Sequence, residues 1–163
     1  MSQVENLVKS SEKLTVFFGC WPSFHDAEVV DVHYWRGAVQ PGDWHDSNIF
    51  PVLTVKLRIL RATQKDYSSN SPDVLATLRF YDVDHFMMDG FNHVNQIFDF
   101  TVESQERGTF PNGEKWPPEF VISFVRGFGM SASFHCFHIE VLDAVPYRDQ
   151  TDDASSSKSS VSN

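Results

Sequence analysis

A histidine and an aspartate stand side by side in the segment FGCWPSFHDAEVVDVHYW, between two apolar stretches. Imidazole and carboxylate groups are common ligands of divalent metal ions, so His25 and Asp26, with Glu28 nearby, could begin the site of a metal-dependent hydrolase. Such a site needs several converging ligands, and at least one would come from elsewhere in the chain. The candidates for that ligand are His33, His135 and His138.

The spacing of these residues weakens the metal interpretation. Consecutive residues of an extended segment point to opposite faces, so at most two of His25, Asp26 and Glu28 could reach one ion. A structural interpretation explains more, because Pro22 fixes an extended entry and the His25 and Asp26 side chains can then satisfy backbone groups where a sheet begins. A functional surface that includes these side chains is the other interpretation.

The two cysteines offer no obvious nucleophile. Cys20 in FFGCW and Cys136 in FHCFH lie among aromatic residues, and apolar surroundings raise the pKa of a thiol. We expect both to be reduced and buried, as small hydrophobic side chains of a cytoplasmic protein. The sequence also contains no Gly-x-Ser-x-Gly motif and no glycine-rich phosphate loop.

The segment FYDVDHFMMDGFNHVNQI, residues 80–97, has neither a helical nor a strand period. One interpretation is a structured connection in which Asn92 and Asn95 bond the local backbone. The other is an acidic surface, rich in Met and Phe, that contacts a partner, because such residues are enriched in the cores of interfaces. The candidate contact residues are Asp82, Asp84, Phe86 and Asp89.

Hydrophobic periodicity predicts the elements that position these residues. Apolar residues at helical spacing predict a short amphipathic helix over about residues 3–14. Alternation of apolar and polar residues then predicts half-buried antiparallel strands at 29–35, 52–60, 74–81 and 97–105. The faces expected to be buried include Val30, Val32 and Tyr34 in the first strand and Phe98, Phe100 and Val102 in the last. Segments rich in Pro, Gly, Asn and Ser predict turns at 38–48, 64–73 and 106–118.

The last strand region, SASFHCFHIEVLDAV, contains a change of phase. Ala132, Phe134 and Cys136 occupy even positions, whereas Phe137, Ile139 and Val141 occupy odd ones. One regular strand cannot bury both sets on one face, so either a bulge lies near residues 136–137 or both faces are covered. We predict the bulge.

Length and composition indicate one domain. Fifteen of the 163 residues are phenylalanine, enough apolar area for a core without disulfides. We expect a mostly β fold, an antiparallel twisted sheet or sandwich with one N-terminal helix, over residues 1–147. The Ser- and Asp-rich tail, residues 148–163, is expected to be disordered because it has almost nothing apolar to bury.

The formal charge of −9 at pH 7 limits the choice of partner. It argues against nucleic acid as a ligand, since phosphate binding requires a basic face. It suits a basic protein partner, although solubility alone also explains it. No stretch approaches the ~20 apolar residues that cross a membrane, and no secretory signal is evident, so we expect a cytoplasmic protein without a membrane partner.

Three motifs together resemble a known family. They are WPSFHDAEVVDV near the first strand, FYDVDHFMMDGFNHVNQI in the middle and ASFHCFHIEVLDAVP near the end. The chain is similar, over about residues 17–146, to the immunity protein 50 family of bacterial polymorphic toxin systems. That resemblance implies a non-enzymatic cytoplasmic protein, without a cofactor, that binds and neutralises a toxin encoded by a neighbouring gene.

The resemblance supplies no established binding residues and leaves the toxin open. The expected contact surface therefore consists of the acidic cluster of the middle motif, with His25, Asp26 and Glu28 as a second patch. Two alternatives remain: the metal-dependent hydrolase on His25 and Asp26, and a small-molecule-binding β domain. The latter is considered because apolar sheets with aromatic rims form pockets.

Overall fold

The computed structural model describes residues 3–37, 50–66 and 70–147. These residues form one mixed sheet of nine strands in the order β1-β9-β4-β3-β2-β6-β7-β8-β5. The strands are β1 (Val8–Lys9), β2 (Glu28–Trp35), β3 (Val52–Ile59), β4 (Val74–Tyr81), β5 (Asp84–Asp89), β6 (Gln96–Gln105), β7 (Glu119–Phe128), β8 (Ser131–Cys136) and β9 (His138–Pro146). The helical segments are the 3₁₀ turns η1 (Gln3–Leu7) and η2 (Arg61–Thr63) and the helix α1 (Glu12–Phe18). The predicted mostly β fold with one N-terminal helix is confirmed.

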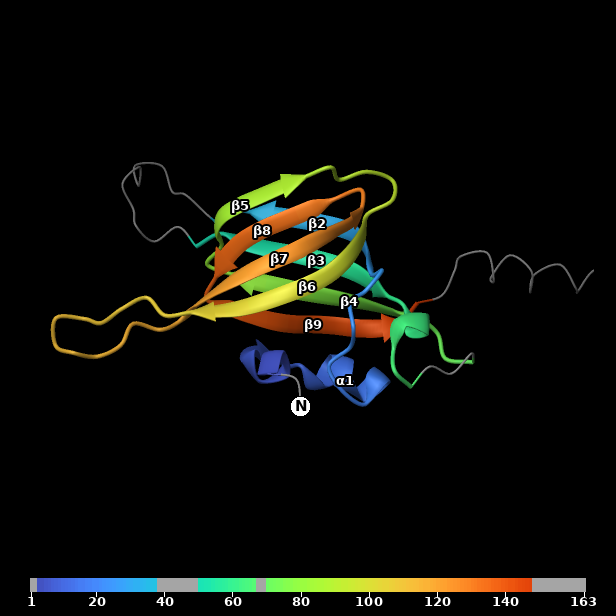
Figure 1. The fold of residues 1–163 in the computed structure, drawn as a ribbon, viewed down its shortest axis with the longest axis horizontal. Coiled ribbons are helices and arrows are strands. Elements are labelled where there is room, and N and C mark those ends of the chain that lie inside the picture. Colours follow the sequence, from blue (N-terminus) through green and yellow to red (C-terminus); the bar gives the residue numbers. More distant parts are fainter. Residues whose placement is uncertain (1–2, 38–49, 67–69, 148–163) are drawn as a thin grey trace, which may run out of the picture.

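The sheet folds over on itself, so that β6, β7, β8 and β5 lie across β2, β3, β4 and β9 (Figure 1). Neighbouring strands are antiparallel except for β1, which pairs in parallel with β9. Phe80 of β4 joins the two halves. Its ring centroid lies 6.2 Å from that of Phe100, 6.3 Å from that of Phe124 and 4.9 Å from that of Phe134.

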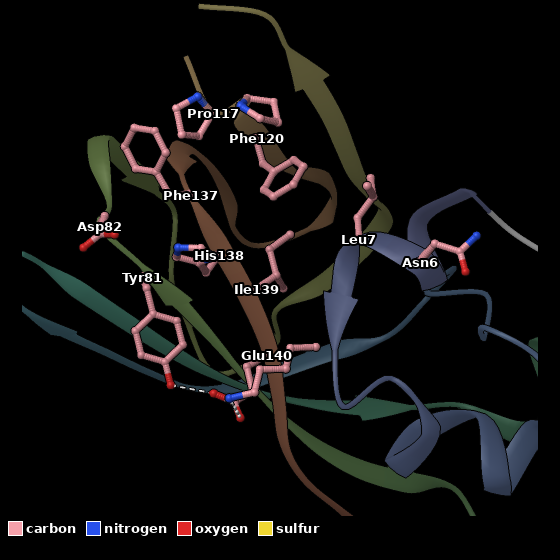
Figure 2. Close-up of a pocket in the computed structure, with 12 residues that line it drawn as sticks. Asn6, Leu7, Tyr81, Asp82, Pro117, Phe120, Phe137, His138, Ile139 and Glu140 are labelled. Carbon is pink, nitrogen blue, oxygen red and sulfur yellow. Dashed lines mark hydrogen bonds and ion pairs between the residues drawn. The ribbon is translucent and has the colours of Figure 1, made fainter. Parts of the chain in front are cut away.

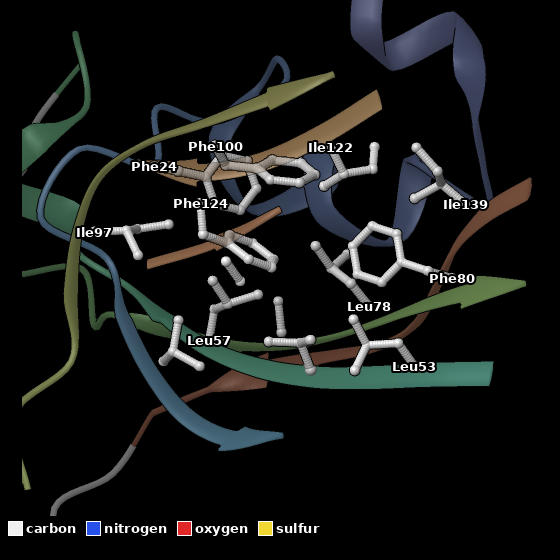
Figure 3. Packing of buried hydrophobic residues seen from close by; sticks show 14 of the residues in the cluster. Phe24, Leu53, Leu57, Leu78, Phe80, Ile97, Phe100, Ile122, Phe124 and Ile139 are labelled. Carbon is white, nitrogen blue, oxygen red and sulfur yellow. The ribbon is translucent and has the colours of Figure 1, made fainter. Parts of the chain in front are cut away.

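The core between the two halves consists of aliphatic and aromatic side chains from every strand that was predicted by alternation (Figure 3). Leu53, Leu57, Leu78 and Ile122 are among those with no exposed surface. Each such side chain stabilises the fold by about 1.5–3 kcal/mol through removal of apolar surface from water. The sheet therefore holds its strand ends, where the candidate residues lie, in fixed positions.

The N-terminal helix begins later than predicted. Residues 3–7 form a 3₁₀ turn, and Val8 and Lys9 then leave the helical path to pair with β9. Ser10 has a left-handed φ of 59°, which interrupts the helical pattern. The α-helix follows only at residues 12–18 and ends at Gly19, whose φ of 76° is the left-handed C-cap conformation. Pairing with the sheet has here overridden the helical periodicity.

Two predicted strand faces are only partly confirmed, because each strand contains a bulge: Phe100 is buried, and Val32 and Val102 pack against the core, as predicted. The register between β2 and β3 shifts around Val30, which is 43% exposed, whereas Val29 is fully buried. The register between β6 and β7 shifts around Phe98, which is 55% exposed, whereas Ile97 is fully buried. An extra residue in one strand moves the following side chains to the other face.

The predicted bulge at residues 136–137 is a bend instead. β8 ends at Cys136, Phe137 forms the bend, and β9 begins at His138. The backbone N–H of Phe137 donates to the carbonyl oxygen of Tyr81 at 3.1 Å. The change of phase arises because the chain passes from one half of the folded sheet to the other, so each half buries its own set of residues.

Two further strands, β5 and β7, were not predicted. β7 alternates cleanly, with Phe120, Ile122 and Phe124 buried, so its sequence did contain the signal. β5 has no period because its register with β8 shifts between Asp84 and Met87. The turn expected at 38–48, part of the turn at 64–73 and the tail at 148–163 lie outside the described residues.

Candidate functional site

Strand register divides the candidate residues between two ends of the sheet. Across β3, Trp35 of β2 is level with Tyr81 of β4, and Glu28 of β2 is level with Leu75 of β4. The connection between β6 and β7, residues 106–118, projects from the body at the Trp35 end (Figure 1). We call this connection the arm, the end that bears it the arm end, and the other end the opposite end.

His25 and Asp26 form a tight turn at the opposite end. Their side chains pair with each other, with 3.1 Å between Nδ1 of His25 and Oδ2 of Asp26. Asp26 has a left-handed φ of 61°, and its backbone N–H donates to the carbonyl oxygen of Ile97 at 3.0 Å. The His25 ring lies 4.8 Å from the ring of Phe98. The two residues thus connect the start of β2 to β6. The structural interpretation expected their side chains to satisfy backbone groups, but within the described residues they pair with each other instead.

Asn95 satisfies those backbone groups. Its side chain is 4% exposed and is the one buried polar side chain in the described ranges. Nδ2 donates to the carbonyl oxygens of Asn92 at 2.6 Å and Val29 at 3.4 Å, and Oδ1 accepts from the N–H of Asn92 at 2.6 Å. The interpretation of the middle segment as a connection tied by Asn side chains therefore fits this part of the structure.

The possible metal ligands are spread over the sheet. His33 lies five residues beyond Glu28 along β2, a separation of about 17 Å at the rise of a strand. His138 pairs with Tyr81 at the arm end, far from His25. Among the described residues, no group of three or more His, Cys, Asp or Glu side chains is arranged to hold a metal ion. The hydrolase alternative is therefore not favoured.

Asp82 and Asp84 lie at the arm end, between β4 and the start of β5. Asp82 is half-buried and has a left-handed φ of 57°. Its carboxylate makes no hydrogen bond or ion pair with any residue that the structure describes. Asp84 is exposed and accepts from the N–H of His85 at 2.8 Å, and its Oδ2 lies 3.5 Å from Nε2 of the same histidine.

Phe86 points partly inward from β5. Its ring stacks on Tyr34 of β2 with a centroid separation of 5.0 Å and an interplanar angle of 6°, and it lies 6.0 Å from the ring of Phe134. This contact fixes β5 against β2. The adjacent Met87 and Met88 point outward instead and are 68% and 41% exposed. With the exposed Phe91, they form the apolar surface of the middle motif that is available to a partner.

Asp89 lies at the opposite end of β5 and forms an ion pair with Arg126 of β7. The same guanidinium group contacts Ser131 Oγ at 3.2 Å. Gly90 follows with a φ of 73°, and its backbone approaches Gly129 so closely that a Cβ would lie 2.4 Å from the Gly129 carbonyl oxygen. Asp89 therefore already has a partner, whereas Asp82 has none in the part of the chain that the structure describes.

Two hollows open on the arm end. The larger, of about 750 Å³, lies between η1, β9 and the start of β7 (Figure 2). The smaller, of about 320 Å³, lies beside the start of β5. Asp82 and Phe137 line both hollows, so the bend between β8 and β9 separates them.

A small charged network borders the larger hollow. The Tyr81 hydroxyl donates to Oε2 of Glu140 at 2.7 Å, and Lys9 Nζ lies 3.2 Å from Oε1 of Glu140 (Figure 2). The hydrogen bond from Tyr81 is the main cause of a lowered pKa of Glu140, and the Lys9 ammonium group is the next. Partial burial, and then the Glu140 carboxylate, raise the pKa of Tyr81. The rim of this hollow therefore keeps a protonated phenol beside a carboxylate at neutral pH.

The arm is an ordered hairpin extension. Thr109 and Lys115 form a bridge, and the Trp116 N–H donates to the Gly108 carbonyl oxygen at 2.9 Å. Lys115 also pairs with Glu106 at 3.0 Å. From the sequence, only a turn was predicted for residues 106–118. Its Phe, Trp and Arg residues, interspersed with turn-forming Gly and Pro, were the available signal that the turn has a structure of its own.

The two cysteines differ in environment. Cys136 is fully buried, and desolvation, reinforced by the charges of Glu119 and Asp82, raises its pKa to about 12. Cys20 is exposed, so the prediction that both thiols are buried is wrong for this residue. The chain turns outward at Gly19 after the helix, and this places Cys20 on the surface. Both cysteines are free thiols.

The fold and the arm end define a small β protein that presents an open surface of aromatic and carboxylate side chains. The model of the immunity protein 50 family matches residues 10–147. The chain therefore belongs to the immunity protein 50 family, as its motifs predicted. No curated protein and no solved structure matches the chain. In the described residues no helix has the length and apolar character that a membrane span requires.

Proposed function

We propose that this protein neutralises a bacterial protein toxin by binding to it in the cytoplasm, without catalysing a reaction. The observation that carries the proposal is the match of residues 10–147 to the immunity protein 50 family. The toxin is then the product of a neighbouring gene in a polymorphic toxin system. The charge of −9 supports a partner with a basic surface, because opposite charge accelerates association.

The arm end is the part of the predicted contact surface that the geometry favours. Asp82 borders both hollows there and Asp84 the smaller one, whereas Asp89 is paired with Arg126 and His25 with Asp26. Carboxylates that lack a strong cation among the described residues remain available to a partner. We therefore place Asp82 and Asp84 within the toxin contact, and give Phe86, Asp89, His25, Asp26 and Glu28 a lesser part in it.

The small-molecule alternative depends on the larger hollow. Its volume of about 750 Å³ falls within the range of ligand pockets, and it opens along the surface between η1 and β7. Surface hollows beside exposed aromatic residues also accept side chains of a protein partner. Family membership indicates a protein toxin as the partner, whereas the hollow alone indicates no particular ligand. Toxin binding is therefore the better-supported function.

Protection of cells against the neighbouring gene product tests the proposal. Cells that express the toxin with this protein should survive, and cells that express the toxin alone should not. The double variant Asp82→Asn/Asp84→Asn should lose protection. A matched control, Asp66→Asn/Asp143→Asn, changes the charge equally at two exposed positions elsewhere and should protect like the original protein.

Each double variant is checked for folding by thermal unfolding before its protection is compared. Full protection by a folded Asp82→Asn/Asp84→Asn variant would reject the acidic contact but leave toxin binding intact. Death of cells that express the toxin together with the unaltered protein would reject the proposed function for that toxin. The variant Asp26→Asn/Glu28→Gln tests the second patch in the same assay.

A further inference from the structure

The arm is ordered by contacts among its own residues rather than by burial against the sheet. The Phe110 and Trp116 rings stack with centroids 3.9 Å apart. The Phe110 carbonyl oxygen accepts from the Gly113 N–H at 2.9 Å, which closes a turn with Pro111 in its second position. All residues from 106 to 118 are exposed except Phe110, which is half-buried.

Arg107 continues this stack to the body of the protein. Its guanidinium carbon lies 5.3 Å from the centroid of the Trp116 ring and 4.6 Å from that of the Phe137 ring. Phe137 is the bend that borders both hollows. A continuous row of rings and one guanidinium group therefore runs from the arm to the two hollows. This row fixes the direction of the arm, whose backbone projects from the sheet in Figure 1.

Stability of the domain does not require such a row. The core is filled without it, and Trp116 remains 40% exposed although it is a large apolar side chain. Trp and Arg are the residue types most enriched among those that dominate binding energy at protein interfaces. Rigid aromatic side chains that are held in place beforehand lose little conformational entropy on binding.

The shape and charge of the arm end indicate the kind of surface that fits it. A hairpin that projects from the body can bury both of its sides only in a concave partner, and the concave sites of enzymes are their active-site clefts. Carboxylates lie at both ends of the arm: at its base Asp82 borders both hollows and Asp84 the smaller one, and Glu114 follows the turn at its tip. The matching cleft has basic residues on its rim.

We propose that the arm enters a cleft of the toxin with a basic rim, where Phe110, Trp116 and Arg107 make the central contacts. This inference rests on the proposed function and specifies how the toxin is bound. Arg107 spans the junction between arm and body, and Asp82 and Asp84 face the basic rim. The partner is thus an enzyme whose cleft the arm blocks.

Binding measurements with purified, catalytically inactive toxin encoded by the neighbouring gene test the inference. Trp116→Ala and Arg107→Lys should each weaken binding by about 30-fold or more, the effect typical of dominant interface residues. Arg107→Lys preserves the charge but loses the planar group that stacks on the two rings. The control is Phe128→Ala, which removes a 67% exposed ring at the opposite end and should change the affinity by less than about 3-fold.

A shortened chain provides a second test. Gln105 and Glu119 are the last paired residues of β6 and β7, so an Asn-Gly turn can replace residues 106–118. Thermal unfolding shows whether this variant keeps its fold, and the folded variant should fail to protect cells. A photo-cross-linking residue in place of Phe110 should attach to residues that line the active-site cleft of the toxin.

The outcomes separate the inference from the proposed function. Tight binding by the Trp116→Ala and Arg107→Lys variants, or a cross-link to a convex outer surface of the toxin, would overturn the arm contact while toxin binding stands. Failure of the unaltered protein to bind or to protect would overturn the proposed function and the inference with it. An association rate that does not fall between low and high salt would overturn the basic rim.

Discussion

Replacement of Asn95 by alanine should destabilise the protein strongly, although the residue lies far from the arm. Its amide makes two hydrogen bonds of 2.6 Å with the backbone of Asn92, each contributing about 1 kcal/mol. A third, longer bond of 3.4 Å reaches the carbonyl oxygen of the fully buried Val29, and loss of that partner adds about 1 kcal/mol. We therefore expect Asn95→Ala to lower the free energy of unfolding by about 3 kcal/mol. That loss corresponds to a fall in Tm of about 6–12 °C for a domain of this size.

Urea unfolding followed by tryptophan fluorescence measures this loss. The matched control is Asn112→Ala on the arm, where an exposed side chain accepts one hydrogen bond of 3.1 Å from the Glu114 N–H. Because water can replace that bond, the control should change the free energy of unfolding by less than about 0.5 kcal/mol. Equal effects at the two positions would refute the reasoning that burial makes the Asn95 amide structurally essential.

Three further predictions concern other parts of the fold. Gly129→Ala should lower the free energy of unfolding by more than about 3 kcal/mol, because a Cβ at this φ of 89° would lie 2.0 Å from the Val94 carbonyl oxygen. The control is Gly19→Ala at the end of α1, where a Cβ meets no atom within 4 Å and the loss should be only about 1 kcal/mol. A thiol reagent at pH 8 should modify Cys20 in the native protein but Cys136, whose pKa is raised to about 12, only after denaturation. Because the pKa of Glu140 is lowered in the folded state, this carboxylate stabilises the fold above its unfolded-state pKa, and the stabilisation is lost as the pH falls through the folded-state pKa. Tyr81→Phe removes the hydrogen bond that lowers this pKa, so the free energy of unfolding should depend less on pH between about pH 6 and 3.

Much of the sheet could be predicted from the local sequence, because alternating apolar and polar residues indicate which face of a strand is buried. The strands at 52–59 and 74–81 match their predicted ranges closely, and their buried residues are the predicted ones. β7 carried the same signal in Phe120, Ile122 and Phe124. The family could also be predicted, from three motifs that lie within the residues matched by its model.

The errors arise where pairing between distant segments overrides local pattern. The bulges at Val30 and Phe98 depend on register with neighbouring strands, which one strand's sequence does not encode. The late start of α1 depends on the pairing of Val8 with β9. For the arm only a turn was predicted, and its direction depends on the contact of Arg107 with Phe137, a residue far along the chain.

Asp82 offers a way to separate binding from stability. Its half-buried carboxylate has lost part of its hydration and, within the described residues, has gained no hydrogen bond or ion pair in return. A cation of the toxin would supply that missing partner, whereas Asp84 already contacts His85. Asp82→Asn also keeps a side chain that tolerates the left-handed φ of 57°. We therefore expect Asp82→Asn to leave the free protein equally or more stable in urea and to weaken toxin binding more than Asp84→Asn does. An interaction that Asp82 makes only in the complex cannot contribute to the stability of the free protein. If Asp82→Asn lowers the free energy of unfolding but leaves the affinity for the toxin unchanged, the carboxylate stabilises the fold and does not contact the toxin.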